Sequence, residues 1–325
     1  MASIAIGRTG TEAGDGSVIA GAALIGDAAS SAALAQSPIA ATLTNHAMAN
    51  ALDKIVARKR LEVAAKKRAA PVEGLKERIA ELGRPRNFFQ AVVDHGSTKG
   101  TRVIAEVKQR SPSGGLIRPD FDPVDIARRY HANGAVAISC LTDEVDFGGS
   151  LEFIHAIRDA VPLPVLRKDF IIESYQVWEA RAYGADAILL IAECLSDSQL
   201  IDYKILAVEL GMSVLVEVHD TENLYRVQPH LSFPHSGYAL LGVNNRDLRT
   251  MTTDLGHSFR MAELVDDTHV MVSESGIRTP DDLKRLRAHG IHIVLVGEHL
   301  LRQPDPGTAL AELLGREPRE PATKR

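Results

Sequence analysis

The sequence predicts an α/β protein of the (β/α)8 TIM-barrel class with an N-terminal helical extension. From Thr101 onward, short aliphatic runs alternate with longer segments of helical periodicity, and there are eight such pairs. Together they span about 210 residues, a size typical of a closed (β/α)8 barrel. The short runs are apolar along their whole length, as expected of parallel strands that are buried on both faces.

The eight pairs give the expected strands and helices in chain order. We expect strands at residues 103–106, 135–141, 164–167, 187–191, 213–218, 239–243, 270–273 and 293–296. We expect the helices that follow them at residues 123–132, 151–160, 174–183, 196–210, 221–227, 258–265, 280–289 and 307–314. Four glycines stand where a left-handed residue would end a helix, namely Gly134, Gly184, Gly211 and Gly290. A doubly wound open sheet is the alternative fold, but no G-x-G-x-x-G sequence follows the first strand.

We place the barrel at residues 101–315. The chain outside it divides into three predicted parts. Residues 1–45 are rich in Ala, Gly and Ser, and they predict a flexible extension rather than a signal peptide. Residues 46–100 are expected to hold helices at 49–70 and 72–82 that cap the barrel, and residues 316–325 a frayed C-terminal tail. The first helix is basic, which we interpret as a solvated face rather than a surface for nucleic acid or membrane.

Composition excludes several classes of function. Lys and Arg number 37 against 42 Asp and Glu, a net charge of −5, which argues against a nucleic-acid partner. The sequence has no apolar stretch near the roughly 18 residues of a membrane span, so we expect no membrane partner. The two cysteines, Cys140 and Cys194, do not suit a disulfide scaffold or a thiolate zinc site, and no histidine spacing indicates a metal. We therefore expect a cytoplasmic protein.

Charged and amide side chains follow the predicted strands at their carboxyl ends. These residues are Glu106, Lys108, Lys168, Glu217 and Asn244. In a (β/α)8 barrel the carboxyl ends of the strands carry the chemistry, so we expect these side chains to converge on one pocket. Close packing of such charges would change their pKa values, which suits proton transfer near neutral pH.

Glycine-containing loops after the last two strands predict a phosphate site. Ser275 and Gly276 follow the seventh strand, and Gly297 and Glu298 follow the eighth. Loops at these places commonly hold a phosphate with backbone N–H groups, and glycine allows the close approach that this requires. Ser111, in the loop after the first strand, offers a hydroxyl group to the same anion.

The ordered set of strand-end motifs resembles the indole-3-glycerol-phosphate synthase family of tryptophan biosynthesis. The motifs are IAEVKQRSPS at 104–113, LRKDF at 166–170, LVEV at 215–218, GVNNRDL at 242–248, SESGI at 273–277 and LVGE at 295–298. The resemblance runs from about residue 52 to residue 314 in one order. It implies a carboxy-lyase that acts on 1-(2-carboxyphenylamino)-1-deoxyribulose 5-phosphate by ring closure, decarboxylation and dehydration, without a cofactor.

The resemblance also implies roles for individual residues. Lys168 matches the general acid at the ketose oxygen, and Glu217 matches its partner in proton transfer during dehydration. A lysine can serve as such an acid if its neighbours lower its pKa. Glu106 and Lys108 match residues around the substrate carboxylate and hydroxyls, and Asn244 one that orients the substrate. The remaining matches concern substrate or phosphate binding: Ser111, Phe147, Arg246, Glu274, Ser275, Gly276, Gly297 and Glu298. Which lysine donates in which step stays open.

Two other functions are weighed against this one. Phosphoribosylanthranilate isomerase is a related phosphate-binding barrel, but it uses a cysteine base and an aspartate acid, whereas the first strand here ends in Glu106 and Lys108. A non-catalytic barrel that serves as a partner in a tryptophan-pathway complex is the other alternative. The presence of Lys108, Lys168 and Glu217 argues against it. Association of an active enzyme with other tryptophan-pathway enzymes stays open.

Overall fold

The computed structural model describes residues 51–93, 100–232, 234–247, 250 and 252–322. The flexible extension expected at residues 1–45 lies outside the described residues. No helix in the described part of the chain is long and apolar enough to cross a membrane.

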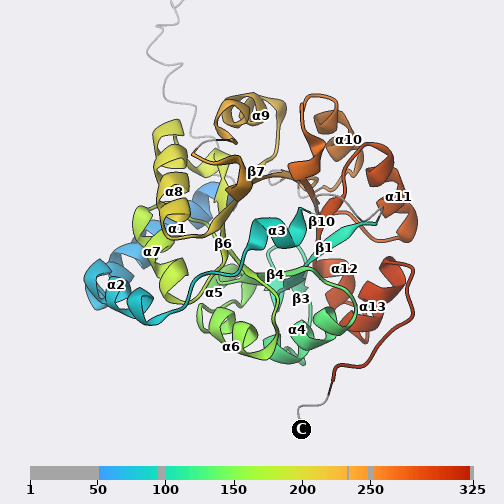
Figure 1. The fold of residues 1–325 in the computed structure, drawn as a ribbon, viewed down its shortest axis with the longest axis horizontal. Helices are drawn as coiled ribbons and strands as arrows, with labels where there is room; N and C mark the ends of the chain where they lie inside the picture. Colours follow the sequence, from blue (N-terminus) through green and yellow to red (C-terminus); the bar gives the residue numbers. More distant parts are fainter. Residues whose placement is uncertain (1–50, 94–99, 233, 248–249, 251, 323–325) are drawn as a thin grey trace, which may run out of the picture. The chain divides into compact units, whose positions relative to one another are not determined.

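The strands close into a parallel barrel in the order β1-β10-β9-β8-β7-β6-β5-β4, which confirms the predicted fold class (Figure 1). A closed ring excludes the doubly wound open sheet. The barrel strands are β1 (Arg102–Val107), β4 (Ala137–Leu141), β5 (Val165–Lys168), β6 (Ala187–Ile191), β7 (Ser213–Val218), β8 (Ala239–Asn244), β9 (Met271–Glu274) and β10 (Ile293–Val296). The first and last residues of each predicted strand lie within two residues of the ends of an observed strand. A short hairpin, β2 (Arg110–Ser111) and β3 (Gly115–Leu116), follows β1 and was not predicted.

The helices surround the barrel and lie close to their predicted positions. They are α4 (Pro123–Ala132), α6 (Glu152–Ala160), α7 (Ser174–Ala182), α8 (Asp197–Glu209), α9 (Thr221–Val227), α10 (Gly256–Ala262), α11 (Pro280–Ala288) and α13 (Pro306–Leu313). Side-chain caps fix the first turns of α4, α8, α9, α11 and α13, as where Thr279 accepts a hydrogen bond from the Asp282 N–H at 3.2 Å. The predicted glycines Gly134, Gly184, Gly211 and Gly290 all have positive φ. Two short helices, α5 (Glu144–Phe147) and α12 (Glu298–Leu301), were not predicted.

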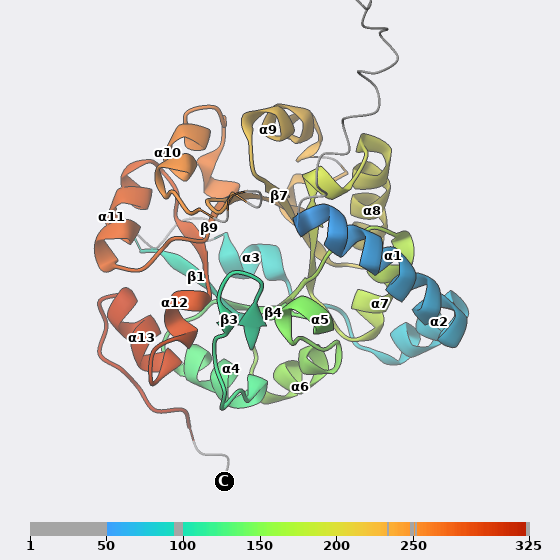
Figure 2. The same ribbon diagram turned by 180° about the vertical axis from the view of Figure 1, so that it is seen from behind.

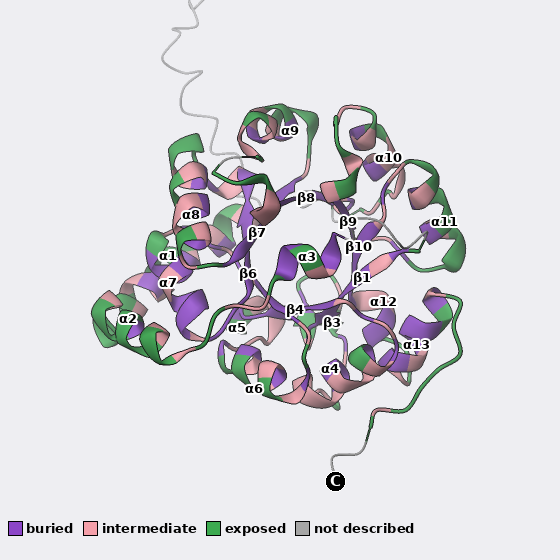
Figure 3. Cartoon of the chain, viewed as in Figure 1, coloured by how far each residue is buried: buried purple, intermediate pink, exposed green. Residues whose placement is uncertain are grey.

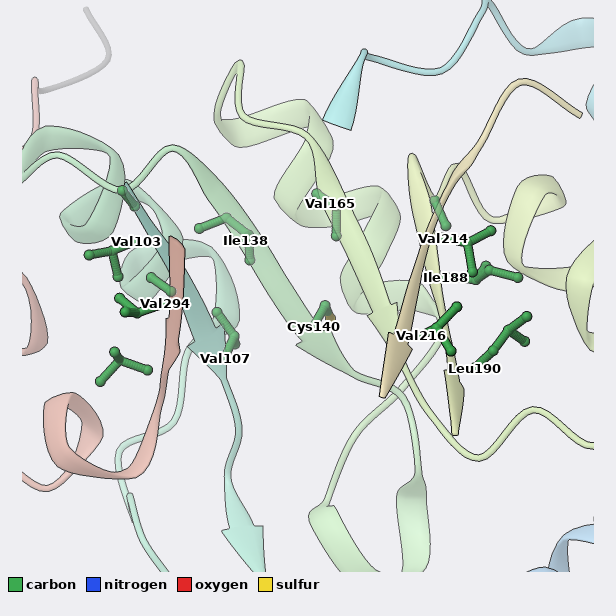
Figure 4. Packing of buried hydrophobic residues seen from close by; sticks show 14 of the residues in the cluster. Val103, Val107, Ile138, Cys140, Val165, Ile188, Leu190, Val214, Val216 and Val294 are labelled. Carbon is green, nitrogen blue, oxygen red and sulfur yellow. The ribbon is translucent and has the colours of Figure 1, made fainter. Parts of the chain in front are cut away.

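Two apolar layers hold the barrel together. The outer layer lies between the strands and the helices and includes Val103, Ile138, Val165 and Val214 (Figure 4). Figure 3 shows that burial follows the strands and the inward sides of the helices, while their outer sides are exposed. Because alternate residues of a strand face opposite sides, the neighbouring positions form a second layer inside the ring.

The inner layer is closed at the amino ends of the strands by a helix that the sequence did not predict, α3 (Phe88–Val92). Phe88 is fully buried, and with Phe89 it packs against inward side chains such as Ile104, Leu166 and Leu215. In Figure 1 α3 lies across the centre of the ring of strands. The segment is too short for helical periodicity to stand out, which is why it escaped sequence analysis.

The N-terminal helices α1 (Ala51–Ala69) and α2 (Val72–Glu81) form the predicted extension. Figure 2 shows α1 on the face of the barrel that also carries α5 and the β2–β3 hairpin, the opposite face to that of Figure 1. Val63 and Leu75 pack with Tyr175 of α7 in a small apolar cluster.

The C-terminal segment is tied to the barrel up to Arg319. The Asn133 amide donates to the Arg319 carbonyl at 2.8 Å and accepts from the Arg319 N–H at 2.8 Å. Residues 316–319 are therefore held against the barrel, whereas the sequence predicted a frayed tail from residue 316. A single buried asparagine at the end of a helix gives no signal in the sequence that it will bind a segment 186 residues away.

Candidate active site

The inward positions of the strands are apolar along the barrel and become polar at the carboxyl ends. These terminal inward residues are Glu106 on β1, Lys168 on β5, Glu217 on β7, Asn244 on β8 and Glu274 on β9. Parallel strands in a closed ring bring all five to one mouth. Sequence analysis expected Glu106, Lys168, Glu217 and Asn244 to converge in this way, together with Lys108, which lies beside Glu106. Asn244 and Glu274 stand directly opposite each other in the register of β8 and β9.

The mouth contains a pocket of about 510 Å³. Every residue predicted for the site lines it: Glu106, Lys108, Ser111, Phe147, Lys168, Glu217, Asn244, Arg246, Glu274, Ser275, Gly276, Gly297 and Glu298. The volume suits one small-molecule ligand.

Lys168 lies at the centre of the buried charges. Its Nζ donates to Glu217 Oε2 at 2.9 Å and lies 3.4 Å from Glu274 Oε2. The Asn244 amide donates to the other oxygen of Glu217 at 3.2 Å. Both oxygens of Glu217 therefore have partners, and the orientation of this carboxylate is fixed before any ligand arrives.

The charges around Lys168 shift the pKa values in opposite directions. Burial alone would lower the pKa of Lys168, but the carboxylates of Glu217, Glu274 and Glu106 raise it. The neighbours of Lys168 therefore raise its pKa rather than lower it, and they hold the side chain as an ammonium ion. Burial would raise the pKa of Glu217, but Lys168 and His219 lower it. Burial and the charge of Glu217 raise the pKa of Glu274, so Glu274 binds a proton more readily than Glu217.

A second acid–lysine pair lies beside the first. Lys108 Nζ donates to Glu106 Oε1 at 2.5 Å, and both side chains are buried. Gly297 of the loop after β10 packs directly against this pair. A Cβ at position 297 would lie 2.4 Å from Glu106 Oε1, so this position requires glycine.

The loop after β9 contains two successive left-handed residues, Ser275 and Gly276, with φ of 67° and 80°. Ser275 is the one non-glycine residue with positive φ in the described ranges, and such strain is typical of functional loops. Asn245, which the sequence analysis did not single out, supports the loop by donating to the Ser275 carbonyl at 3.1 Å. Backbone N–H groups that a turn leaves free can bind an anion.

Two arginines and Glu298 form the rim next to this loop. Arg246 contacts Glu298 Oε2 at 3.0 Å and Ser113 Oγ at 2.8 Å. Arg302 contacts the other Glu298 oxygen at 2.9 Å. The Glu298 carboxylate therefore points at these arginines. Sequence analysis did not single out Arg302, which stands four residues after the LVGE motif and caps the short helix α12 that was not predicted.

The opposite wall of the pocket is apolar. Phe147 and Phe170 lie with their ring centroids 6.1 Å apart. Leu52 and Ile55 of α1 complete this wall, so the N-terminal helix belongs to the pocket as well as to the outside of the barrel. Sequence analysis assigned α1 only a capping role, because nothing in its periodicity indicates which loop it contacts.

A buried ion cluster fixes α1 to the barrel. Lys59 is 4% exposed, and its Nζ lies 2.8 Å from Asp143 Oδ2 and 2.9 Å from Asp169 Oδ1. Arg58 pairs with Asp143 and with Asp146. The interpretation of the basic helix as a solvated face is thus wrong for Arg58 and Lys59. Asp169 directly follows Lys168, and Asp143 begins the short helix that carries Phe147.

Another contact that sequence analysis missed involves His219. The side chain is only 10% exposed, and Nε2 lies 3.4 Å from Glu217 Oε1. The signal available in the sequence was its spacing, since His219 stands two residues after Glu217 and therefore on the same side. A search of the described residues finds no group of three His, Cys, Asp or Glu side chains placed to hold a metal.

Sequence comparison relates the chain to one family. The family profile described as indole-3-glycerol phosphate synthase matches residues 52–313. The chain is 46% identical over 268 residues to the indole-3-glycerol phosphate synthase of Rhodospirillum rubrum, covering 82% of this chain and 100% of that protein. It is 47% identical over 266 residues to the enzyme of the same name from Rhodopirellula baltica, covering 81% of this chain and 98% of that protein.

Comparison with solved structures shows the barrel alone. A 3-hexulose-6-phosphate synthase superposes with a TM-score of 0.53 at 15% identity, covering 66% of this chain and 98% of that chain. At this identity the likeness concerns the fold and not the reaction.

Proposed function

The chain belongs to the indole-3-glycerol phosphate synthase family, and from its pocket we propose how its residues carry out that reaction. The activity is that of a carboxy-lyase of tryptophan biosynthesis, which converts 1-(2-carboxyphenylamino)-1-deoxyribulose 5-phosphate into indole-3-glycerol phosphate. Family membership also supports a cytoplasmic location, and association with other enzymes of the pathway stays a prediction.

The contact between Lys168 and Glu217 carries the proposal. Ring closure places negative charge on the ketose oxygen, and the Lys168 ammonium group supplies the proton. The neighbouring carboxylates that raise the pKa of Lys168 ensure that this proton is present at neutral pH. Decarboxylation then restores the aromatic ring. Glu217, a carboxylate with a low pKa, takes up a proton during dehydration while an acid protonates the departing hydroxyl group.

The other residues are assigned by their place in the pocket. The apolar wall of Phe147 and Phe170 fits the anthranilate ring. The left-handed loop at Ser275 and Gly276 fits the phosphate. Glu106 and Lys108 lie beside the reacting groups, where Lys108 can pair with the substrate carboxylate. The substrate thereby spans the pocket with its reacting carbons beside Lys168.

Replacing Glu217 with glutamine tests the proposed proton transfer. The amide keeps the shape of the side chain but cannot accept a proton, so we expect kcat to fall by about 10²–10⁴-fold, the usual share of a general base. KM should stay within about threefold, because the pocket keeps its shape. Steady-state kinetics that follow indole absorbance would check this. An active Glu217→Gln enzyme would refute the role of Glu217.

Replacing Gly276 with alanine tests the proposed phosphate site. The new Cβ would lie 2.7 Å from Thr253 Cγ2 at a position with φ of 80°, so the loop must shift. We expect KM to rise by about tenfold with kcat nearly unchanged, because the loop would hold the phosphate equally in the ground and transition states. Gly315→Ala is the control, since φ there is 66°, there is open space around its Cβ, and it does not line the pocket. A fall in kcat alone would mean that this loop serves the chemistry instead.

A further inference from the structure

His219 lies at the mouth of the barrel directly after β7, two residues beyond Glu217. Its side chain is 10% exposed. The short 3-10 helix η2 (Ala192–Cys194), which follows β6, brings Glu193 to the other side of the imidazole ring. The His219 backbone N–H donates to Glu193 Oε1 at 2.9 Å, which anchors the two loops to each other.

Each ring nitrogen of His219 faces a different carboxylate. Nε2 lies 3.4 Å from Glu217 Oε1, and Nδ1 lies 3.2 Å from Glu193 Oε2. These are ion-pair distances and not hydrogen bonds, since neither ring nitrogen nor Glu193 Oε2 has a hydrogen-bond partner among the described residues. A neutral imidazole carries a lone pair on one nitrogen and would turn it toward one of these carboxylates. Only the imidazolium ion is attracted to both carboxylates, so this placement favours a charged His219.

We propose that His219 is a positioning residue, an imidazolium bridge between Glu193 and Glu217 that orients the Glu217 carboxylate and keeps it charged. This inference rests on the proposed role of Glu217 in proton transfer. His219 does not line the pocket, so it acts on the substrate through Glu217.

The charges around His219 favour this state. Burial would lower the pKa of His219, but Glu193 and Glu217 raise it against the opposing charge of Lys168 on β5. From α10, His257 faces the same region, and burial, Arg260 and His219 lower the pKa of His257. His257 is thus the neutral imidazole of the two at neutral pH.

A second cation on Glu217 matters at the moment when Lys168 gives up its proton. In the proposed ring closure the N–H bond of Lys168 breaks and an O–H bond forms at the ketose oxygen, which leaves a neutral amine beside Glu217. Without another positive charge, the buried Glu217 carboxylate would then lose its main electrostatic partner. The imidazolium ion of His219 keeps it ionised and in place for the dehydration that follows.

The pH dependence of His219→Gln tests the bridge. The glutamine amide can donate to one carboxylate but carries no charge, so we expect kcat to fall by roughly tenfold at neutral pH, the factor that matches about one pKa unit. KM should stay within about threefold. In the wild type, kcat should decline as the pH rises through the raised pKa of His219, and this limb should be missing in His219→Gln. His269→Gln, at an exposed histidine, should keep the wild-type profile.

Glu193→Gln is the second variant, since it leaves the imidazole in place. Removing one carboxylate should lower the pKa of His219, so the alkaline limb should move to lower pH. The ring-nitrogen chemical shifts of ¹⁵N-histidine-labelled enzyme measure the same pKa without turnover, and both Glu193→Gln and Glu217→Gln should lower it. A neutral His219 at pH 6.5, or a His219→Gln enzyme with wild-type kcat and profile, would overturn the bridge. An active Glu217→Gln enzyme would instead refute the proposed function, whatever the shifts report.

Discussion

Replacement of Lys168 with alanine is expected to lower kcat by at least about 10³-fold while KM changes little. The ammonium group of Lys168 is the proposed proton donor in ring closure, and a general acid commonly contributes 10²–10⁴-fold. The variant also leaves Glu217 and Glu274 buried without the cation that separates their charges, so the orientation of the base suffers too. Single-turnover measurements with saturating substrate would separate this loss from slow product release.

The controls for Lys168 separate charge from geometry. Lys168→Arg keeps the positive charge, but its planar guanidinium ion holds its proton far more tightly, so it should restore little activity. Lys284→Ala removes an exposed lysine of α11 and should leave the kinetics unchanged. A Lys168→Ala enzyme with normal kcat and a raised KM would mean that Lys168 binds substrate and that the donor is another group, such as Lys108.

Replacement of Lys59 with methionine should lower the free energy of unfolding by about 3 kcal/mol. Removing one partner of a buried ion pair typically costs about 3–5 kcal/mol, since the other charge stays buried without compensation. We expect the lower end of this range because, without Lys59, Asp143 still pairs with Arg58 and Asp169 still pairs with Arg167. Urea unfolding followed by circular dichroism would measure the change.

Lys67→Met is the matched control on the same helix. Lys67 pairs with Glu173 at 2.7 Å, but its side chain is 49% exposed, and such surface pairs contribute about 0–1 kcal/mol. Equal destabilisation by the two variants would show that the buried cluster does not hold α1 in place. If Lys59→Met instead kept wild-type stability, the two carboxylates that lose Lys59, Asp143 and Asp169, would be compensated by solvent that enters the cluster.

The same cluster predicts loss of stability in acid. Burial would raise the pKa of Asp169, but Arg167 and Lys59 lower it below the ordinary carboxyl value. The stabilisation from Asp169 is therefore fully present above the pKa of an unfolded aspartate, and it is lost as the pH falls toward the lower value of the folded state. In Lys59→Met this acid-dependent part should shrink.

The barrel could be predicted because each strand is a continuous apolar run of a length that only a parallel, doubly covered sheet accommodates. The four left-handed glycines could also be predicted from local sequence, because a helix often ends in a left-handed residue and glycine adopts that conformation most easily. In contrast, α3 and the β2–β3 hairpin depend on tertiary contacts. From the sequence alone, Phe88 and Phe89 look like part of a loop. The apolar surface on which they pack is the barrel interior, which exists only in the folded protein.

The position of the site residues was predictable because strand order and period two decide which side chains meet. Their protonation was not. The direction of the pKa shift of Lys168 could not be predicted, because the sequence does not reveal that Glu217 and Glu274 both lie within 3.4 Å of it. The contacts of Lys59 were missed for a related reason, since Asp143 and Asp169 lie on other elements. The same holds for Glu193, the second partner of His219.

The closure of the amino end of the barrel by Phe88 and Phe89 of α3 determines how small molecules reach the pocket. With the amino end of the barrel sealed by apolar side chains, molecules enter and depart by the rim that bears Arg246 and Glu298. Substrate and product therefore pass through the same opening of the pocket. We therefore expect indole-3-glycerol phosphate to compete with the substrate, because both would occupy the same pocket.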